Sequence, residues 1–131
     1  MLFRSLIMDQ NNDSLYVGGE THLDRATGIK AGKSELCGDV YMKGISVGEN
    51  HTVTLSGEKD VTVNLTDNTT LGELVIANSD KRKVIAEGAL FAKSVNCGDK
   101  PLTVVSHDAM FGFGKLTCSE LDVEEIGRAH V

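Results

Sequence analysis

The sequence repeats one octapeptide at a distance of 41 residues: residues 56–63 read SGEKDVTV and residues 97–104 read CGDKPLTV. Both copies place a small residue, an acidic residue and a lysine before an alternating apolar segment. This order is typical of a tight turn followed by a strand. With one inserted residue the match extends from Gly72-Glu73-Leu74 to Gly114-Lys115-Leu116. The similarity therefore indicates a structural repeat and not a single shared turn.

Turns of the same kind recur along the whole chain. They begin at Gly19, Gly38, Gly57, Ser79, Gly98 and Ser119, with spacings of 19, 19, 22, 19 and 21 residues. Periods in this range are typical of solenoids, in which each unit buries its apolar face only against its neighbours. The sequence thus predicts that these six residues form one column of stacked turns.

The segments between the turns read as short strands. Val61, Val63 and Leu65 alternate with polar residues, which is the period of a half-buried strand. Gly, Asn and Asp interrupt every run before a helical stripe could form. Each repeat of about 20 residues contains about three short apolar clusters, each long enough for one strand. The sequence therefore predicts an all-β fold, a parallel β-helix (β-solenoid) of about six coils of about 20 residues. An antiparallel β-sandwich remains the alternative, because strands spaced 8 to 12 residues apart also suit that fold.

All three cysteines directly precede a predicted turn. The residues in that position are Gly18, Cys37, Ser56, Asn78, Cys97 and Cys118. Stacked coils lie about 4.8 Å apart, so the pattern predicts a buried thiol ladder of Cys37, Cys97 and Cys118. The same spacing is compatible with a disulfide between Cys97 and Cys118. The odd count and the absence of a CxxC motif argue against a zinc site.

Composition excludes two classes of partner. The chain has 131 residues with 19 acidic and 13 basic side chains, an excess that argues against a nucleic-acid surface. No apolar run approaches the roughly 18 residues that a membrane span needs. The length fits one domain.

The two ends depart from the repeat. Residues 1–5 (MLFRS) and 125–131 (EIGRAHV) back-translate into reverse-complementary DNA that resembles the ends of a sequencing-library adapter. On this interpretation residues 6–124 are a native β-solenoid fragment of a longer protein, and the other residues are left out of the fold argument. The acidic character remains without Arg4, Glu125 and Arg128.

The candidate reactive residues form no established motif. Residues 28–34 (GIKAGKS) have three residues between the glycines where a phosphate-binding loop needs four, so a polar loop is expected there. His22, His51 and His107 each lie among polar residues, and we expect solvated positions at strand ends. His107 and Asp108 could act as an acid/base pair only if carboxylates from neighbouring coils converge on them.

Enzyme signatures are also absent. The Asn-Thr-Asp, Asp-Asp, Gly-His-Gly and Arg-Ile-Lys motifs of pectin hydrolases do not occur, and the glycine pattern of the calcium-binding nonapeptide repeat fails. The basic run of residues 81–83 (KRK) is expected to form a turn and not a ligand patch. The sequence predicts no catalytic residue, no metal ligand and no cofactor. A paired-carboxylate mechanism stays open, because it depends on spatial approach.

The turns, together with the VTVNL and LTVV segments, resemble right-handed β-helix segments of bacterial surface proteins and phage fibres. The chain is similar, more weakly, to the bactofilins, whose coils polymerise end to end. The first resemblance implies a non-catalytic shaft at the cell surface, capped by the rest of its own chain. The second implies a cytoplasmic polymer that self-associates through open ends. A carbohydrate-binding or carbohydrate-active β-helix is a third alternative. In all three, Val63 is expected to point inward near the column of Val104.

Overall fold

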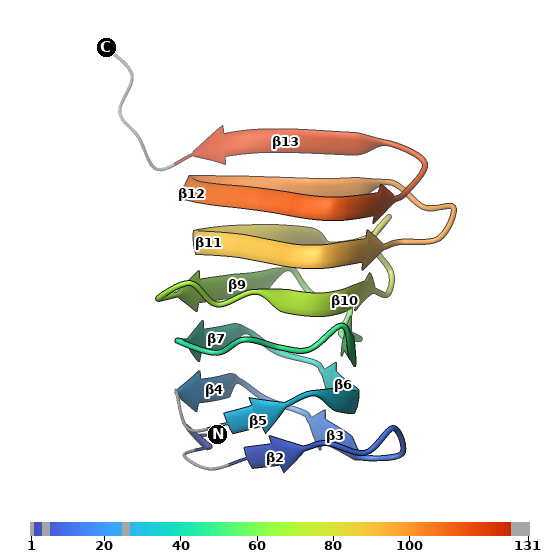
Figure 1. Cartoon of the computed structure of the whole chain (residues 1–131). Coiled ribbons are helices and arrows are strands. Elements are labelled where there is room, and N and C mark those ends of the chain that lie inside the picture. Colours follow the sequence, from blue (N-terminus) through green and yellow to red (C-terminus); the bar gives the residue numbers. More distant parts are fainter. Residues whose placement is uncertain (1, 4–5, 25–26, 127–131) are drawn as a thin grey trace.

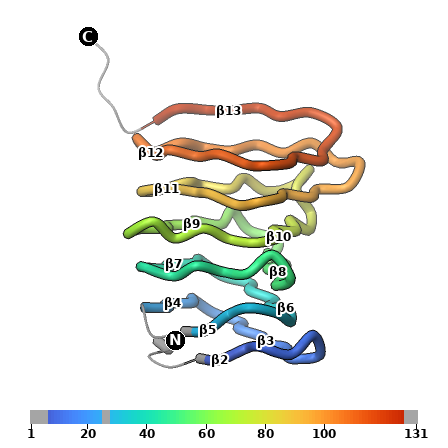
Figure 2. The backbone as a smooth tube through the Cα atoms, in the orientation of Figure 1, coloured from blue at the N-terminus to red at the C-terminus, as the bar shows by residue number. Residues whose placement is uncertain are grey.

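The computed structural model describes residues 2–3, 6–24 and 27–126, and every strand pairing within them is parallel. The chain winds upward through about six stacked coils, as Figures 1 and 2 show. The predicted parallel β-solenoid is therefore confirmed, and the antiparallel sandwich is wrong. The described part contains no helix long and apolar enough to cross a membrane.

Three faces make up each of the lower coils. The first face stacks β1 (Leu2–Phe3), β4 (Thr21–Asp24), β7 (Val40–Lys43) and β9 (Val61–Thr66). The second stacks β3 (Ser14–Val17), β6 (Ala31–Leu36), β8 (Asn50–Leu55) and β10 (Leu71–Ile76). The third is short, with β2 (Leu6–Met8) on β5 (Thr27–Ile29) and a single bridge from Ser46 to Thr70.

The upper coils have two faces, because their strands are long and bent. The 14-residue β11 (Lys83–Asn96) and the 16-residue β12 (Leu102–Thr117) each run across both faces. Bends lie at Gly88 (φ 71°) and Asp108 (φ 52°), where the strand register shifts. Strand β13 (Leu121–Ile126) covers only the first half of β12. The second half of β12 therefore has no strand above it among the described residues.

Aliphatic side chains fill the interior in columns along the axis. One column runs through Val61, Val84 and Val104, and another through Leu36, Leu55 and Ile76, all at most 4% exposed. Each such side chain contributes about 1.5–3 kcal/mol when it leaves water. Because each coil covers the next, the core is a continuous rod and not a central cluster.

Val63 points inward as predicted and is 1% exposed, but it does not lie in the column of Val104, as the sequence analysis expected. It stacks on Val40 and Ala86. Val104 stacks instead, through Val84, above Val61. Val104 lies 43 residues after Val61, so the 41-residue offset of the sequence repeat misses the structural register by two residues.

The predicted turn column holds only in the lower coils. Gly38 lies against Gly19, since a Cβ at Gly38 would come 2.6 Å from the Gly19 carbonyl oxygen. Gly57 lies equally close to the Cys37 carbonyl oxygen, but Gly98 has no atom within 4 Å of the added Cβ. The Ser119 amide donates to the Lys100 carbonyl, beyond Gly98. A single column of six residues is therefore wrong, because the corner segments differ in length from coil to coil.

The acidic residues of the turns connect successive coils. The Asp39 carboxylate accepts a hydrogen bond of 2.9 Å from the backbone amide of Thr62, and the Asp60 carboxylate accepts one of 2.8 Å from that of Lys83. Each bond satisfies an amide at the start of a strand one coil above. Asp39 and Asp60, which both lie directly before a strand, thus have a structural role.

The ends of the chain are only partly described. Leu2 and Phe3 pair with β4, and Glu125 and Ile126 pair with β12. Residues 1, 4–5 and 127–131 lie outside the described residues. The adapter origin of both ends stays a prediction.

Close approach between coils requires glycine at position 72. A Cβ there would overlap the Gly48 carbonyl oxygen and lie 2.9 Å from that of His51. We expect Gly72→Ala to lower the free energy of unfolding by about 1–3 kcal/mol, because the backbone of two coils must separate. Urea unfolding followed by circular dichroism measures the effect. Gly19→Ala is the matched control, since nothing lies within 4 Å of its added Cβ. Equal losses in the two variants would contradict this packing.

Candidate functional site

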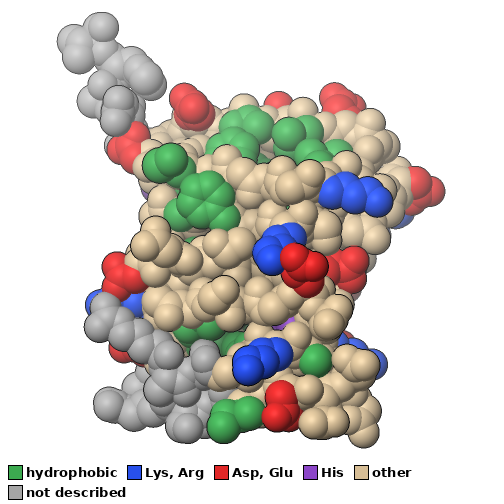
Figure 3. Space-filling model, in the orientation of Figure 1, with side chains coloured by type: hydrophobic (Ala, Val, Ile, Leu, Met, Phe, Trp, Pro, Cys, Tyr) green, Lys and Arg blue, Asp and Glu red, His purple; other side chains and the backbone are tan. Residues whose placement is uncertain are grey.

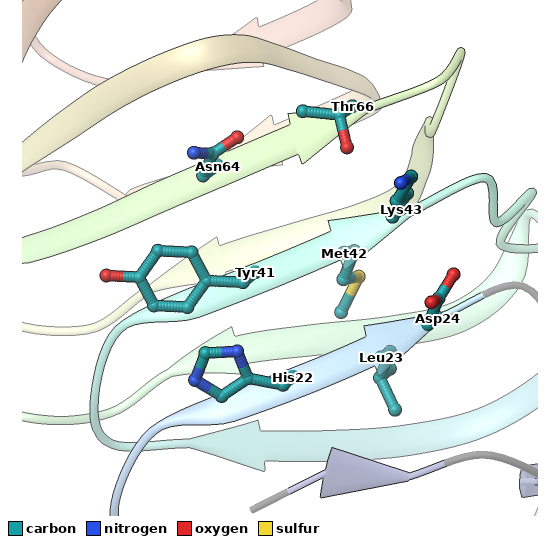
Figure 4. A pocket seen from close by; sticks show the side chains of 8 residues that line it. All are labelled: His22, Leu23, Asp24, Tyr41, Met42, Lys43, Asn64 and Thr66. Carbon is teal, nitrogen blue, oxygen red and sulfur yellow. The ribbon is translucent and has the colours of Figure 1, made fainter.

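A groove of about 290 Å³ lies on the outer face of β4, β7 and β9 (Figure 4). Strand register places its outward side chains in two columns, one of His22, Tyr41 and Asn64 and the other of Asp24, Lys43 and Thr66. Leu23 and Met42 alternate with them and point into the core. The groove is therefore built by the strand period itself, with one polar side chain from each coil in each column.

The imidazole of His22 and the phenol of Tyr41 stack face to face. Their ring centroids are 4.7 Å apart and the ring planes differ by 11°. The Nε2 atom of His22 lies 3.2 Å from the Glu20 carboxylate. Burial raises the pKa of Tyr41, and the carboxylates of Asp39, Glu20 and Glu87 raise it further. Tyr41 is thus a protonated phenol at neutral pH and can donate a hydrogen bond.

The Oδ1 atom of Asn64 is buried without a hydrogen-bond partner. A Cβ at Gly88 would lie 2.8 Å from this atom, so the glycine makes room for it. Amide, phenol and ammonium groups along the groove can hydrogen-bond a polar ligand. The described residues contain no cluster of three or more His, Cys, Asp or Glu side chains that could hold a metal ion.

Comparison of the chain with family models, with curated proteins and with solved structures finds no match. The functional argument therefore rests on the fold and on the side chains alone.

His51 does not lie at a solvated strand end, as the sequence predicted, but inside the solenoid. It is 1% exposed. Its Nδ1 atom lies 2.9 Å from the Ala31 carbonyl oxygen, and its Nε2 atom lies 2.9 Å from the Ser34 hydroxyl. Both partners come from the coil below. The prediction failed because the polar neighbours in sequence, Asn50 and Thr52, face outward while His51 faces inward.

His107 is exposed, as expected, and a carboxylate does occupy the next coil. Strand register pairs His107 with Glu87, and Asp108 lies at the bend of β12. The acid/base pair considered from the sequence stays a prediction.

The basic run of residues 81–83 contains a buried arginine that the sequence did not predict. Arg82 is 3% exposed, and its guanidinium donates to the carbonyls of Leu55 and Lys59 over 2.9 and 2.8 Å. Burial lowers the pKa of Arg82, while the charge of Asp60 opposes this shift. Arg82 is therefore a clamp that fixes the turn of one coil to the next. The sequence gives no signal for this role, because the burial of Arg82 depends on carbonyls from another coil.

Residues 28–34 form strands and not the expected polar loop. They contribute to β5 and to β6, and Ser34 lies buried in the core. Gly32 adopts φ 89°, and a Cβ there would lie 2.5 Å from the Asp13 carbonyl oxygen. The close contact between coils explains why glycine occupies position 32, and no phosphate-binding role is needed to explain it.

The cysteines occupy two neighbouring positions and not one column. Asn96 pairs with Thr117, which places Cys97 beside Cys118, and Val75 pairs with Asn96, which places Cys97 above Ile76. Cys37 comes one position later in its coil, since Leu36 shares the Ile76 column through Leu55. Its sulfur lies 3.1 Å from the Ser56 hydroxyl. The three thiols are free.

Thiol reactivity should follow this difference in burial. Cys97 is buried, whereas Cys37 and Cys118 are partly exposed. Burial raises the pKa of the Cys97 thiol, an effect that the Ser79 hydroxyl opposes and that Cys118 increases. We expect Cys97 to react with a maleimide at least about tenfold more slowly than the other two. Mass spectrometry of timed samples measures this order. Equal rates at all three cysteines would contradict the placement.

Proposed function

We propose that the chain is a non-catalytic structural segment, the shaft of a larger surface or fibre protein. The observation that supports this proposal is the unbroken parallel ladder, in which one sheet joins all strands but β2 and β5. Six coils at about 4.8 Å each make a rod of roughly 29 Å. A rod of this kind holds apart whatever is attached to its two ends.

Mechanical resistance along the rod tests this function. The chain is placed between two marker domains of known unfolding force and extended by atomic force microscopy. A shaft that unwinds coil by coil must break backbone hydrogen bonds and aliphatic columns at each step. We expect a force peak or plateau above the baseline. Extension without measurable force would contradict the proposal. A glycan array gives a second test: specific binding of a glycan by the parent chain, lost in Tyr41→Ala, would also contradict it.

A second candidate is end-to-end assembly, which the exposed upper end favours. Leu121, Val123 and Ile126 of β13 are 42%, 40% and 50% exposed. Figure 3 shows hydrophobic side chains gathered at this end of the molecule. The outer edge of β13 has no strand beyond it among the described residues. Apolar surface combined with a free strand edge is a template for further pairing.

Sedimentation velocity over a range of protein concentrations tests assembly. We expect the parent chain to form larger species as its concentration rises, and Val123→Lys to reduce them. Glu120→Lys is the control, because it introduces the same ammonium group beside β13. A parent chain that stays monomeric throughout would exclude this candidate.

A further inference from the structure

Three polar or polarizable side chains meet inside the lower half of the solenoid. Ser34 lies between His51 in the coil above and Met8 in the coil below. Its hydroxyl is 2.9 Å from Nε2 of His51 and 4.0 Å from the Met8 sulfur. His51, Ser34 and Met8 are 1%, 5% and 3% exposed. We call this set the His51 cluster; it links the first three coils through their interior.

The hydrogen bonds fix the neutral form of the imidazole. A carbonyl oxygen accepts only, so Nδ1 of His51 carries the proton that is donated to Ala31. Nε2 then accepts the hydrogen of the Ser34 hydroxyl. Protonation of Nε2 would replace this acceptor with a donor and would place a positive charge in the core.

Among the described residues, no carboxylate forms a hydrogen bond with the His51 ring. His51 lies on β8, which pairs with β6 and β10, and the Ser34 hydroxyl connects the ring to Met8 of β2. The charged side chains on β6, β10 and β11, at residue 30 and on residues 45–49 are Lys30, Lys33, Glu35, Glu49, Glu73, Lys83, Glu87 and Lys93; Glu73 and Glu87 are half-buried and the others are exposed. The charge of Glu87 acts on Tyr41 in the outer groove. Glu73 accepts from Thr52, and Glu49 pairs with Lys93. The hydrogen-bond partners of the ring are Ala31 and Ser34. A protonated His51 would therefore be a buried charge without a counter-ion, which is strongly unfavourable.

We propose that the His51 cluster is a proton-sensitive latch, and that protonation of His51 releases the two lower coils while the upper coils stay folded. The latch ties residues 6–36 to the third coil. In a solenoid each coil contacts only its neighbours, so the lower coils can open without unfolding the rest.

The direction of the pH dependence follows from burial. Burial lowers the pKa of His51 below its usual value, and the hydrogen bond to Ala31 opposes this shift. Below the pKa of the unfolded chain, the unfolded state binds a proton that the folded state does not. The stability that neutral His51 contributes is thus fully present at neutral and alkaline pH and declines as the pH falls below about 6.5.

Hydrogen exchange with mass spectrometry on the full chain tests the latch. Protection factors are measured at about pH 7.5 and at about pH 5, with correction for the intrinsic exchange rate. We expect protection in residues 6–36 to fall at least about tenfold in acid, and protection in β11 and β12 to change little. His51→Gln should lose this response, because an amide can donate to Ala31 and accept from Ser34 without titrating.

His22→Gln is the matched control and should respond as the parent does, because His22 lies in the outer groove. If His51→Gln does not fold at neutral pH, a triple variant with Gln at His22, His107 and His130 leaves His51 as the last histidine. A retained acid response in that variant supports the latch, and a lost response overturns it. The latch is also overturned if folded His51→Gln opens in acid as the parent does, or if β11 and β12 lose protection together with residues 6–36.

Discussion

The free energy of unfolding should fall by about 3–5 kcal/mol in Val63→Asp. Val63 is 1% exposed and stacks between Val40 and Ala86 in the interior of the rod. A carboxylate at this position would lie among aliphatic side chains with no positive partner, so it must either stay charged at a high cost or take up a proton. Urea unfolding at neutral pH measures the loss. Partial recovery at acidic pH is expected when the parent is measured under the same conditions.

Ser94→Asp is the matched control for this substitution. Ser94 faces outward on β11, and strand register places it between Glu73 and Lys115. The same carboxylate at this surface should change stability by no more than about 0.5 kcal/mol. If Val63→Asp unfolds at the same urea concentration as Ser94→Asp, the assignment of inward and outward faces is wrong.

Arg82→Met should lower the free energy of unfolding by about 2–3 kcal/mol. The substitution removes the donors to the carbonyls of Leu55 and Lys59 and leaves the turn of one coil detached from the coil above. Arg82→Lys should recover little of this loss, because an ammonium group cannot reproduce the planar arrangement of two donors. Thermal and urea unfolding measure all three proteins.

Lys81→Met is the control for the loss of a positive charge. Lys81 is adjacent in the chain but exposed, so its substitution should be nearly neutral. A fully stable Arg82→Met would show that the turns are held by the backbone ladder alone.

The architecture could be predicted from the sequence because each coil corresponds to one sequence repeat of similar length and apolar pattern. A strand that follows a turn is indicated by Gly57 and by the alternating Val61 and Val63. Similar segments recur about every 20 residues. The register could not be predicted with equal success. Val104 aligns in sequence with Val63 but stacks in the column of Val61, since corner loops of different length shift one face against another.

Single buried polar residues also escaped prediction. The local sequence around His51 and Arg82 is polar, which indicates an exposed position. Each is buried because its partners, Ser34 for His51 and the Leu55 carbonyl for Arg82, come from another coil. Contacts between coils depend on register, so an error of one residue hides them. An error of one residue in register also explains why the sequence analysis placed Cys37 in one column with Cys97 and Cys118.

The groove on β4, β7 and β9 was not predicted as a unit. His22 alone was singled out, and its neighbours Tyr41 and Asn64 lie 19 and 42 residues further along the chain. The signal that could have found the groove is the 19-residue repeat itself, which places His22 directly below Tyr41. Once stacking is known, outward side chains can be read in columns.

Distances between spin labels test the stacked register most directly. Strand register places Tyr16, Glu35, Thr54, Val75, Asn96 and Thr117 in one outward column. In a background with Ala at the three native cysteines, one label at Tyr16→Cys is paired with a second at Asn96→Cys or at Thr117→Cys. Four and five coil steps predict backbone separations of about 19 and about 24 Å, so the two distances should differ by about 5 Å. Equal distances, or a shorter distance to Thr117 than to Asn96, would contradict the β-solenoid and the shaft built upon it.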